Sequence, residues 1–174
     1  VAADTTWPKL AKKLIFNPLG MTHTTYSHKK FTQEPNRASL HQQIDGKWVP
    51  AVKRAADAQA PAGGASSTVL DMAAWLRMHL NDGMFNGQRV VAKGPLQESR
   101  SMQIRTAPSS ADATSISGYA LGINTLVDAT GRVRWQHSGA FTSGAATTIL
   151  MIPSLDVGIV VLTNGWPIGL PEAI

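Results

Sequence analysis

The sequence contains no cysteine, which excludes a disulfide framework, a thiolate metal site and a cysteine nucleophile. Its apolar runs are short, and none approaches the roughly 18 residues that a membrane-spanning helix needs. Charged residues make up only 16% of the 174 residues while apolar residues make up 43%, so a disordered charged tail is also excluded. What remains is a globular chain, long enough for one ordinary domain or for one lobe of a larger one.

Signature motifs for phosphate and metal binding are missing as well. Neither G-x-G-x-x-G nor a Walker A pattern occurs, and the five histidines form no compact metal-ligand spacing. The net charge is +5, and the basic residues that give this excess are scattered over the first third of the sequence. Such scatter is typical of a solvated face and not of the dense basic stripe that nucleic acids require. We therefore expect no metal, no cofactor and no nucleic-acid partner.

Apolar periodicity predicts three helices. The first begins near Thr6 and ends at Asn17, because the proline that follows disfavours a helical conformation in the residue before it. The longest spans residues 68–81, with a threonine as its N-cap and Asp71 near the positive end of its dipole. A shorter helix spans residues 95–104. The predicted buried stripe of the long helix consists of Val69, Met72, Ala73, Leu76 and Leu80.

The last third of the sequence changes to β-branched and alternating segments. Short turns join four predicted strands, at residues 119–127, 132–137, 147–152 and 157–163. The last two are nearly continuous apolar runs, so we expect them to be central and covered on both faces. Residues 17–65 and 106–117 are predicted to be loops, with one extended piece at residues 47–49. The expected architecture is an α+β domain in which helices cover an antiparallel β-meander.

One segment of the predicted sheet combines residues that could carry chemistry. It holds His137, Ser138 and Gly139 on a strand, and a second glycine, Gly144, follows closely. Glycine lets a ligand approach the backbone, an edge strand offers N–H groups to an acyl oxygen, and histidine can hold a charge or relay a proton. By itself, however, a histidine on a strand is more often a half-buried structural residue, and a strand glycine more often marks a bulge.

Three further motifs stand in order around this segment. They are P-L-G-M with a threonine after it (residues 18–21 and Thr24), P-A-G-G-x-S-S (residues 61–67) and Leu-Thr-Asn (residues 162–164). Together with His-Ser-Gly they resemble the serine β-lactamase and penicillin-binding-protein-like hydrolases, in their class C-like branch. The resemblance covers nearly the whole sequence and implies a β-lactamase/transpeptidase-like fold.

The resemblance also implies a mechanism, which is acyl transfer from an ester, amide or β-lactam. In this family a serine of S-x-x-K attacks the carbonyl, and its lysine and a [YS]-x-N residue move protons. His137 would occupy the basic position of the third motif, and Ser138 would supply the adjacent hydroxyl. A histidine at the basic position slightly favours a peptidase or an esterase. The Ala140 N–H would donate to the oxyanion, while Gly139 and Gly144 keep the strand approachable. Two further residues are predicted to border the substrate, Asn164 and Tyr119.

The sequence departs from the family at the nucleophile. Its only S-x-x-K begins at Ser27, in a polar segment after P-L-G-M, and neither Y-x-N nor S-x-N occurs. We therefore interpret Ser27 as a chance match and residues 1–174 as the C-terminal portion of such a hydrolase, inactive in isolation. Two alternatives stay open: a non-catalytic binding or scaffold protein that keeps the fold, and an unrelated small β-rich binding domain, which does not explain the ordered motifs.

The expected partners follow from this interpretation. A meander without its neighbouring strands exposes an edge, so we expect it to require either the missing N-terminal half or self-association. The substrate would be a small-molecule or peptide acyl compound. The family resemblance also favours a periplasmic or secreted location.

Overall fold

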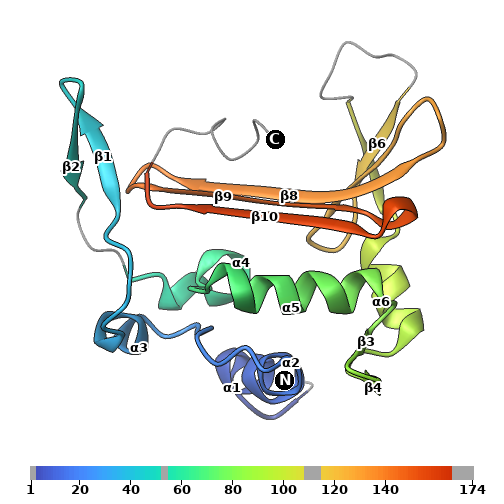
Figure 1. Cartoon of the computed structure of the whole chain (residues 1–174), viewed down its shortest axis with the longest axis horizontal. Helices are drawn as coiled ribbons and strands as arrows, with labels where there is room; N and C mark the ends of the chain where they lie inside the picture. Colours follow the sequence, from blue (N-terminus) through green and yellow to red (C-terminus); the bar gives the residue numbers. More distant parts are fainter. Residues whose placement is uncertain (1–2, 52–54, 108–114, 166–174) are drawn as a thin grey trace.

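Three layers make up the structure, a computed structural model that describes residues 3–51, 55–107 and 115–165. An antiparallel sheet forms the upper layer in Figure 1, the long helix α5 (Val69–Leu80) runs beneath it, and the N-terminal helices lie below α5. Contacts agree with this order, since α5 packs against both strand β10 (Val157–Thr163) and helix α2 (Asn17–Leu19). The expected α+β layered architecture is confirmed.

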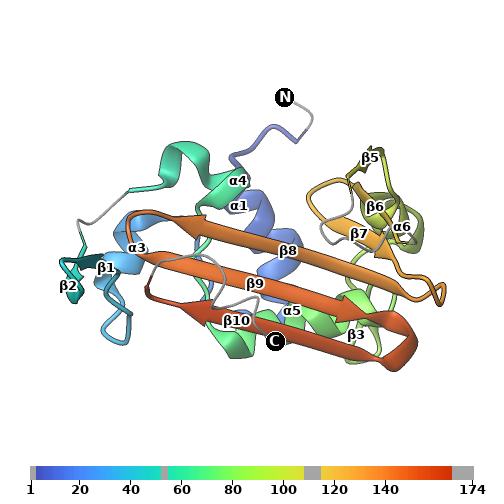
Figure 2. The ribbon, with the colours of Figure 1, turned by 90° about the horizontal axis from the view of Figure 1, so that it is seen from above.

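Six antiparallel strands form the main sheet, in the spatial order β10-β9-β8-β7-β6-β5. Each strand pairs with its neighbour in the sequence, so the predicted meander is confirmed. The other five strands are β5 (Ile104–Thr106), β6 (Ile116–Tyr119), β7 (Asn124–Val127), β8 (Val133–Phe141) and β9 (Ala145–Ile152). Figure 2 shows β8, β9 and β10 side by side above α5.

Two predicted boundaries in this region are wrong. The strand predicted over residues 119–127 is two strands, because Gly122 has a φ of +93° and helps to turn the chain back between β6 and β7. Helix α6 (Lys93–Arg100) ends earlier than predicted, since Ile104 pairs with Tyr119 in the sheet. Of the loop predicted at residues 106–117, the middle part lies outside the described residues, and its flanks belong to β5 and β6.

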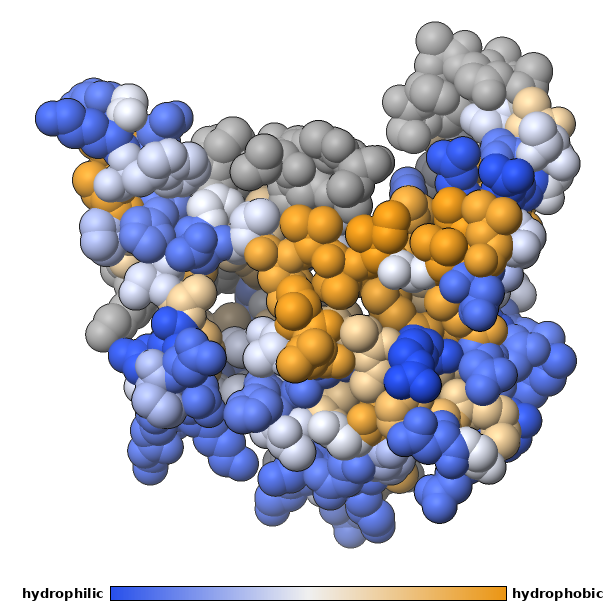
Figure 3. All heavy atoms as spheres, viewed as in Figure 1, coloured by the Kyte–Doolittle hydropathy of each residue, from blue (hydrophilic) through white to orange (hydrophobic). Residues whose placement is uncertain are grey.

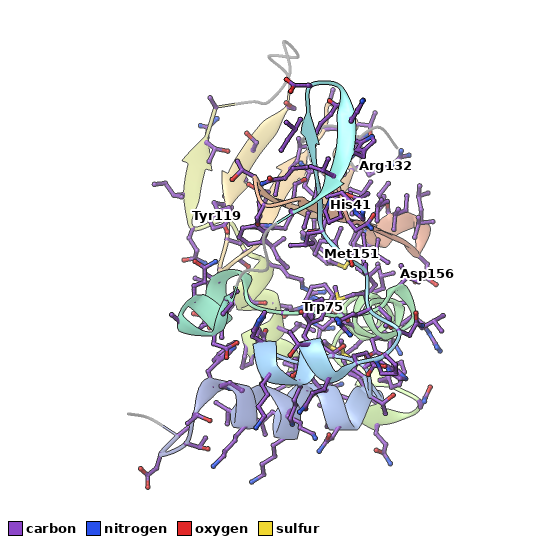
Figure 4. The ribbon with its side chains drawn as sticks, turned by 90° about the vertical axis from the view of Figure 1, so that its left-hand side faces the viewer. His41, Trp75, Tyr119, Arg132, Met151 and Asp156 are labelled. Carbon is purple, nitrogen blue, oxygen red and sulfur yellow. The ribbon has the colours of Figure 1, made fainter. Side chains whose placement is uncertain are left out.

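Strand β10 lies at an edge of the described sheet, so the prediction that it is central is wrong, while β9 lies between β10 and β8. Helix α5 accounts for the apolar residues on one face of β10. At Gly158 a Cβ atom would come within 3.3 Å of Leu76 and of Leu80, so glycine lets the helix approach closely. Met151 of β9 and Trp75 of α5 lie between the sheet and the helix (Figure 4).

Helix α5 is buried on two sides because it forms the middle layer. Leu76 packs towards the sheet, in a cluster with Met151, while Met78 packs among the N-terminal helices, in a cluster with Phe16. Val69 was predicted to belong to the buried stripe, but 51% of it is exposed. A single apolar stripe is the pattern of a surface helix. It therefore predicts only some of the buried residues of a helix that is covered on two sides.

The N-terminal helix runs further than its proline suggested. It consists of α1 (Trp7–Ala11), a π-helical turn (Lys12–Phe16) and α2, and it ends where Gly20 adopts a φ of +68°. The prediction that it ends at Asn17 is therefore wrong. Proline lacks the N–H that an α-helix needs, and the wider π-helical turn before Pro18 places the proline in the first turn of α2, where this donor is not required.

A hairpin stands beside the sheet and confirms the extended piece predicted at residues 47–49. Its strands are β1 (His41–Ile44) and β2 (Lys47–Pro50), and both turn residues between them have positive φ, as a type I′ turn requires. The remaining short elements are α3 (His28–Gln33), α4 (Ala60–Gly63), β3 (Met84–Phe85), β4 (Gln88–Arg89) and 3₁₀ turns at Asp57–Gln59 and Pro153–Leu155. None of the described helices is both long and apolar enough to cross a membrane.

Candidate active site

Strand β8 extends beyond the end of its neighbour β7. Part of the β8 edge therefore has no paired strand among the described residues. The pairing of β7 with β8 ends at Gln136, whereas β9 pairs with β8 as far as Phe141. The carbonyl of Phe141 accepts a hydrogen bond from Gly144 N, which leads into β9. Because N–H groups alternate in direction along a strand, Ala140 N–H points away from β9, towards the edge beyond β7.

The side chain of His137 meets Tyr119, the last residue of β6. The Tyr119 hydroxyl lies 3.2 Å from Nε2 of His137, and the ring centroids are 6.1 Å apart. Both side chains are half-buried. Sequence reasoning placed the two residues near one site, and the structure brings them into direct contact.

Ser138 belongs to the opposite face of the strand, since successive side chains alternate. Its Oγ lies 3.1 Å from Oγ1 of Thr148 on β9, within hydrogen-bond distance. The residue is exposed, whereas Thr148 is buried. The structure therefore pairs the motif hydroxyl with a neighbouring strand and not with the imidazole.

Space beside the strand is open at Gly139. A Cβ atom there would meet only Oγ1 of Thr147, at an ordinary contact distance of 3.5 Å. The P-A-G-G segment packs at the end of the same strand, where a Cβ atom on Gly63 would come 2.9 Å from the Phe141 ring. The second glycine of that segment, Gly64, is needed within the segment itself, because a Cβ atom there would lie 2.6 Å from Cα of Ala60.

Gly144 and Asn164 both contact the segment that leads into the β1–β2 hairpin. Gly144 has a φ of +104°, and a Cβ atom there would come within 2.6 Å of the backbone nitrogen of His41. The backbone carbonyl of Asn164 accepts from His41 N at 2.8 Å, and its side-chain amide donates to the Ser39 carbonyl at 2.8 Å. Together these contacts fasten the β1–β2 hairpin to the end of the sheet. The predicted substrate contacts of both residues stay predictions.

Two of the sequence motifs meet at a buried carboxylate. Asp71 Oδ2 accepts hydrogen bonds from the backbone N–H of His23 at 2.9 Å and from the Thr24 hydroxyl at 2.7 Å. Thr24 Oγ1 also lies 2.7 Å from Oγ of Ser67. The sequence indicated Asp71 only as a favourable charge at a helix N-terminus. Its partners lie more than 40 residues away in the sequence, so no local pattern could reveal them.

The buried guanidinium of Arg100 stacks on Trp135, which lies on β8 two residues before the motif. The guanidinium carbon of Arg100 lies 4.1 Å from the Trp135 ring centre, and the side chain is only 4% exposed. Its other bonds go to Asp82, at 2.9 Å, and to the His79 carbonyl, at 2.7 Å. Hydrogen bonds from Lys93 and then from Arg100 lower the pKa of Asp82. This carboxylate neutralises the buried charge that supports Trp135, and sequence reasoning missed the whole cluster.

Two other features of the structure bear on where a site could lie. Among residues 3–51, 55–107 and 115–165, no three His, Asp or Glu side chains converge where a metal ion could bind. A groove of about 530 Å³ lies between α5 and β10, lined by Leu76, Leu80, Phe85 and Val160 among others. None of the residues that line this groove belongs to β8, so the groove is not at the His-Ser-Gly motif.

Comparisons with known proteins agree with the motif order. The chain aligns with an octameric penicillin-binding protein homologue from Pyrococcus abyssi at 23% identity and a TM-score of 0.75, over 97% of this chain and 35% of that one. It aligns with a D-stereospecific amidohydrolase from Streptomyces sp. at 17% identity and a TM-score of 0.72, over 93% of this chain and 45% of that one. With a D-alanine carboxypeptidase from Burkholderia cenocepacia the identity is 16% and the TM-score 0.68, over 99% of this chain and 53% of that one.

The chain thus spans about a third to a half of the length of these proteins, and at such identities the likeness concerns the fold. No match was found among curated protein sequences. The profile of the beta-lactamase family, in contrast, matches residues 1–172. Because that match spans almost the whole sequence, this chain belongs to the beta-lactamase family.

Proposed function

We propose that this chain forms one wall of the active site of a serine hydrolase that works through an acyl-enzyme. The observation that carries the proposal is the part of the β8 edge beyond β7, where Ala140 N–H points outward and Gly139 leaves open space. An acyl oxygen placed against such an edge can accept a hydrogen bond as it becomes an oxyanion. His137, which is half-buried beside it, provides a polar group on the same strand.

The proposed reaction has two steps. A serine Oγ adds to the substrate carbonyl carbon, the oxyanion is stabilised by Ala140 N–H, and the leaving group departs with a proton. Water then attacks the acyl ester, and the serine oxygen regains its proton as the acid is released. An amide, an ester or a β-lactam each satisfies this scheme. Structural neighbours named as an amidohydrolase and a D-alanine carboxypeptidase support an amide.

The attacking serine is proposed to lie outside these 174 residues. Ser27, the only serine in an S-x-x-K pattern, is the N-cap of α3, and its Oγ accepts from Lys30 N at 3.4 Å. Ser138 lies beside Thr148, as described above. Neither hydroxyl has a hydrogen-bonded base among the described residues, and nucleophilic catalysis by serine needs one.

The test compares two proteins, the 174-residue chain alone and the same chain joined to about 150–200 residues encoded upstream of Val1, an ordinary domain length. Nitrocefin, p-nitrophenyl esters and D-alanyl p-nitroanilides report β-lactamase, esterase and amidase activity. We expect turnover only in the longer protein. Burst acylation by the short chain would contradict the assignment of the nucleophile, and an upstream sequence without S-x-x-K would favour a non-catalytic binding protein.

The oxyanion role has its own pair of variants in the longer protein. Ala140→Pro removes the outward N–H and leaves the bonds to β9 in place, whereas Ala140→Ser keeps the N–H. We expect the proline variant to lose about 10²–10³-fold in kcat, as for other oxyanion donors, and the serine variant to stay close to the parent. Circular dichroism and a melt check that both fold. Equal activity in a folded proline variant would contradict the role.

A further inference from the structure

The contact between Tyr119 and His137 fixes more than a distance, because a neutral imidazole has two nitrogens and one proton. The Tyr119 hydroxyl lies 3.2 Å from Nε2, and among the described residues this is the hydrogen-bond partner of the His137 ring. Which nitrogen carries the proton is set by the bond that the other makes. The direction of this one hydrogen bond therefore decides which hydrogen-bonding groups the ring offers elsewhere.

The chemistry of the two groups favours one direction. A phenol is a stronger acid than a neutral imidazole N–H, with a pKa of about 10 in model compounds, and an imidazole nitrogen is a stronger acceptor than a phenol oxygen. The hydroxyl therefore donates to Nε2, and the ring proton resides on Nδ1. The neutral side chain of free histidine favours the opposite form, with the proton on Nε2, so Tyr119 reverses the intrinsic preference.

We propose that Tyr119 is a positioning residue that holds His137 as the Nδ1–H tautomer. In this form Nδ1 is a donor when the ring is neutral, and it stays a donor when the ring is protonated, since Nε2–H then donates to the phenol oxygen. His137 therefore offers a hydrogen-bond donor to an acceptor oxygen of the acyl substrate in both charge states. That last clause rests on the proposed function, whereas the tautomer does not.

Long-range ¹H–¹⁵N correlation spectra of the ¹⁵N-histidine-labelled 174-residue chain test the proposal, because they distinguish the two tautomers. They are recorded well above the ordinary histidine pKa of about 6.5, and His137→Gln identifies the resonances of His137. We expect the Nδ1–H pattern in the parent chain and a change to the Nε2–H pattern in Tyr119→Phe. The matched control is Tyr26→Phe, since Tyr26 packs against Phe16 and Trp7 and should leave His137 unchanged.

An Nε2–H pattern in the parent chain would overturn the proposal, and so would a folded Tyr119→Phe variant that keeps the Nδ1–H pattern. If Tyr119→Phe does not fold, the spectrum of the parent chain still decides the tautomer. The measurement needs no substrate and no nucleophile. Failure of the hydrolysis assays would therefore leave this result standing, and a wrong tautomer would leave the proposed acyl transfer untouched.

Discussion

The hydroxyl of Thr24 donates a 2.7 Å hydrogen bond to the buried carboxylate of Asp71, across 47 positions of sequence. The same carboxylate oxygen accepts from His23 N, and the next residue, Thr25, forms an isolated bridge with Ser66. The segment after P-L-G-M is thereby joined to the N-terminus of α5. The spacing of two family motifs thus has a physical reason, since each supplies one side of the same junction.

Asp71→Ala should destabilise the chain by about 3–6 kcal/mol. The change leaves the His23 N–H and the Thr24 hydroxyl without their acceptor, and each lost bond to a charged group costs about 1.5–3 kcal/mol. Urea unfolding measures the change in the free energy of unfolding. The control is Glu98→Ala, an exposed acidic residue of α6, which should stay within about 0.5 kcal/mol of the parent. Equal stability of the two variants would contradict the role of Asp71.

Gly64→Ala should destabilise the chain by about 1–3 kcal/mol, because the new Cβ atom would lie 2.6 Å from Cα of Ala60 and 2.9 Å from the Ala56 carbonyl oxygen. Backbone atoms cannot move aside as a flexible side chain can. Gly94→Ala is the matched control, since nothing lies within 4 Å of a Cβ atom there. It should stabilise α6 by up to about 1 kcal/mol through helix propensity. A shift of both urea midpoints in the same direction would count against this explanation.

Local patterns were sufficient for the long helix, for the last two strands of the sheet and for the strand that carries the motif. Residues 157–163 were predicted as a strand and form β10, and the extended piece predicted at residues 47–49 forms most of β2, after the turn at Asp45 and Gly46. Both depend on short-range preferences, namely β-branched runs and residues that tolerate positive φ. The predicted end of the N-terminal helix at Asn17 was wrong, because the sequence does not reveal the π-helical turn that lets the helix continue past Pro18.

What the sequence could not supply were contacts between distant segments. The position of β10 at an edge depends on which strands pair, and an apolar run looks the same in a central strand and in an edge strand that packs on a helix. Arg100 illustrates the same limit at the site. Its guanidinium is stacked on Trp135 and paired with Asp82 through tertiary packing, and a lone arginine in a helix gives no hint of either contact.

His79 should make the stability of the chain dependent on pH. Burial, and then the charge of Arg100, lower the pKa of His79 to about 3 from an unfolded value of 6.5. The unfolded chain therefore binds a proton that the folded chain does not, so stability is fully present above pH 6.5 and is lost as the pH falls towards 3. Between about pH 7 and pH 5 this group alone should remove about 2 kcal/mol.

The measurement is the free energy of urea unfolding at several pH values in the parent chain and in His79→Phe. Phenylalanine keeps an aromatic ring beside Trp75, whose centroid lies 3.9 Å from that of His79, and it cannot titrate. The parent chain should lose more stability on acidification than the variant does. Parallel pH profiles would mean that His79 protonates as readily in the folded chain as in the unfolded one.

The edge of β10 should mediate association of the isolated chain. Seven residues of this strand pair only with β9 among the described strands, and Figure 3 shows apolar residues gathered along this side of the molecule. A long apolar edge strand presents unpaired backbone groups to another strand. We expect sedimentation velocity to reveal self-association, and Val161→Lys to reduce it, because a lysine on an edge strand disfavours edge-to-edge pairing.

The control for this variant is Ile104→Lys, which places the same charge on the opposite edge, at a residue of the three-residue strand β5 that is already 65% exposed. It should leave the association unchanged. A parent chain that is monomeric and melts cooperatively would contradict the expectation that this fold needs a partner strand. Equal loss of association in both variants would contradict the role of the β10 edge, because the added positive charge alone would then explain the loss.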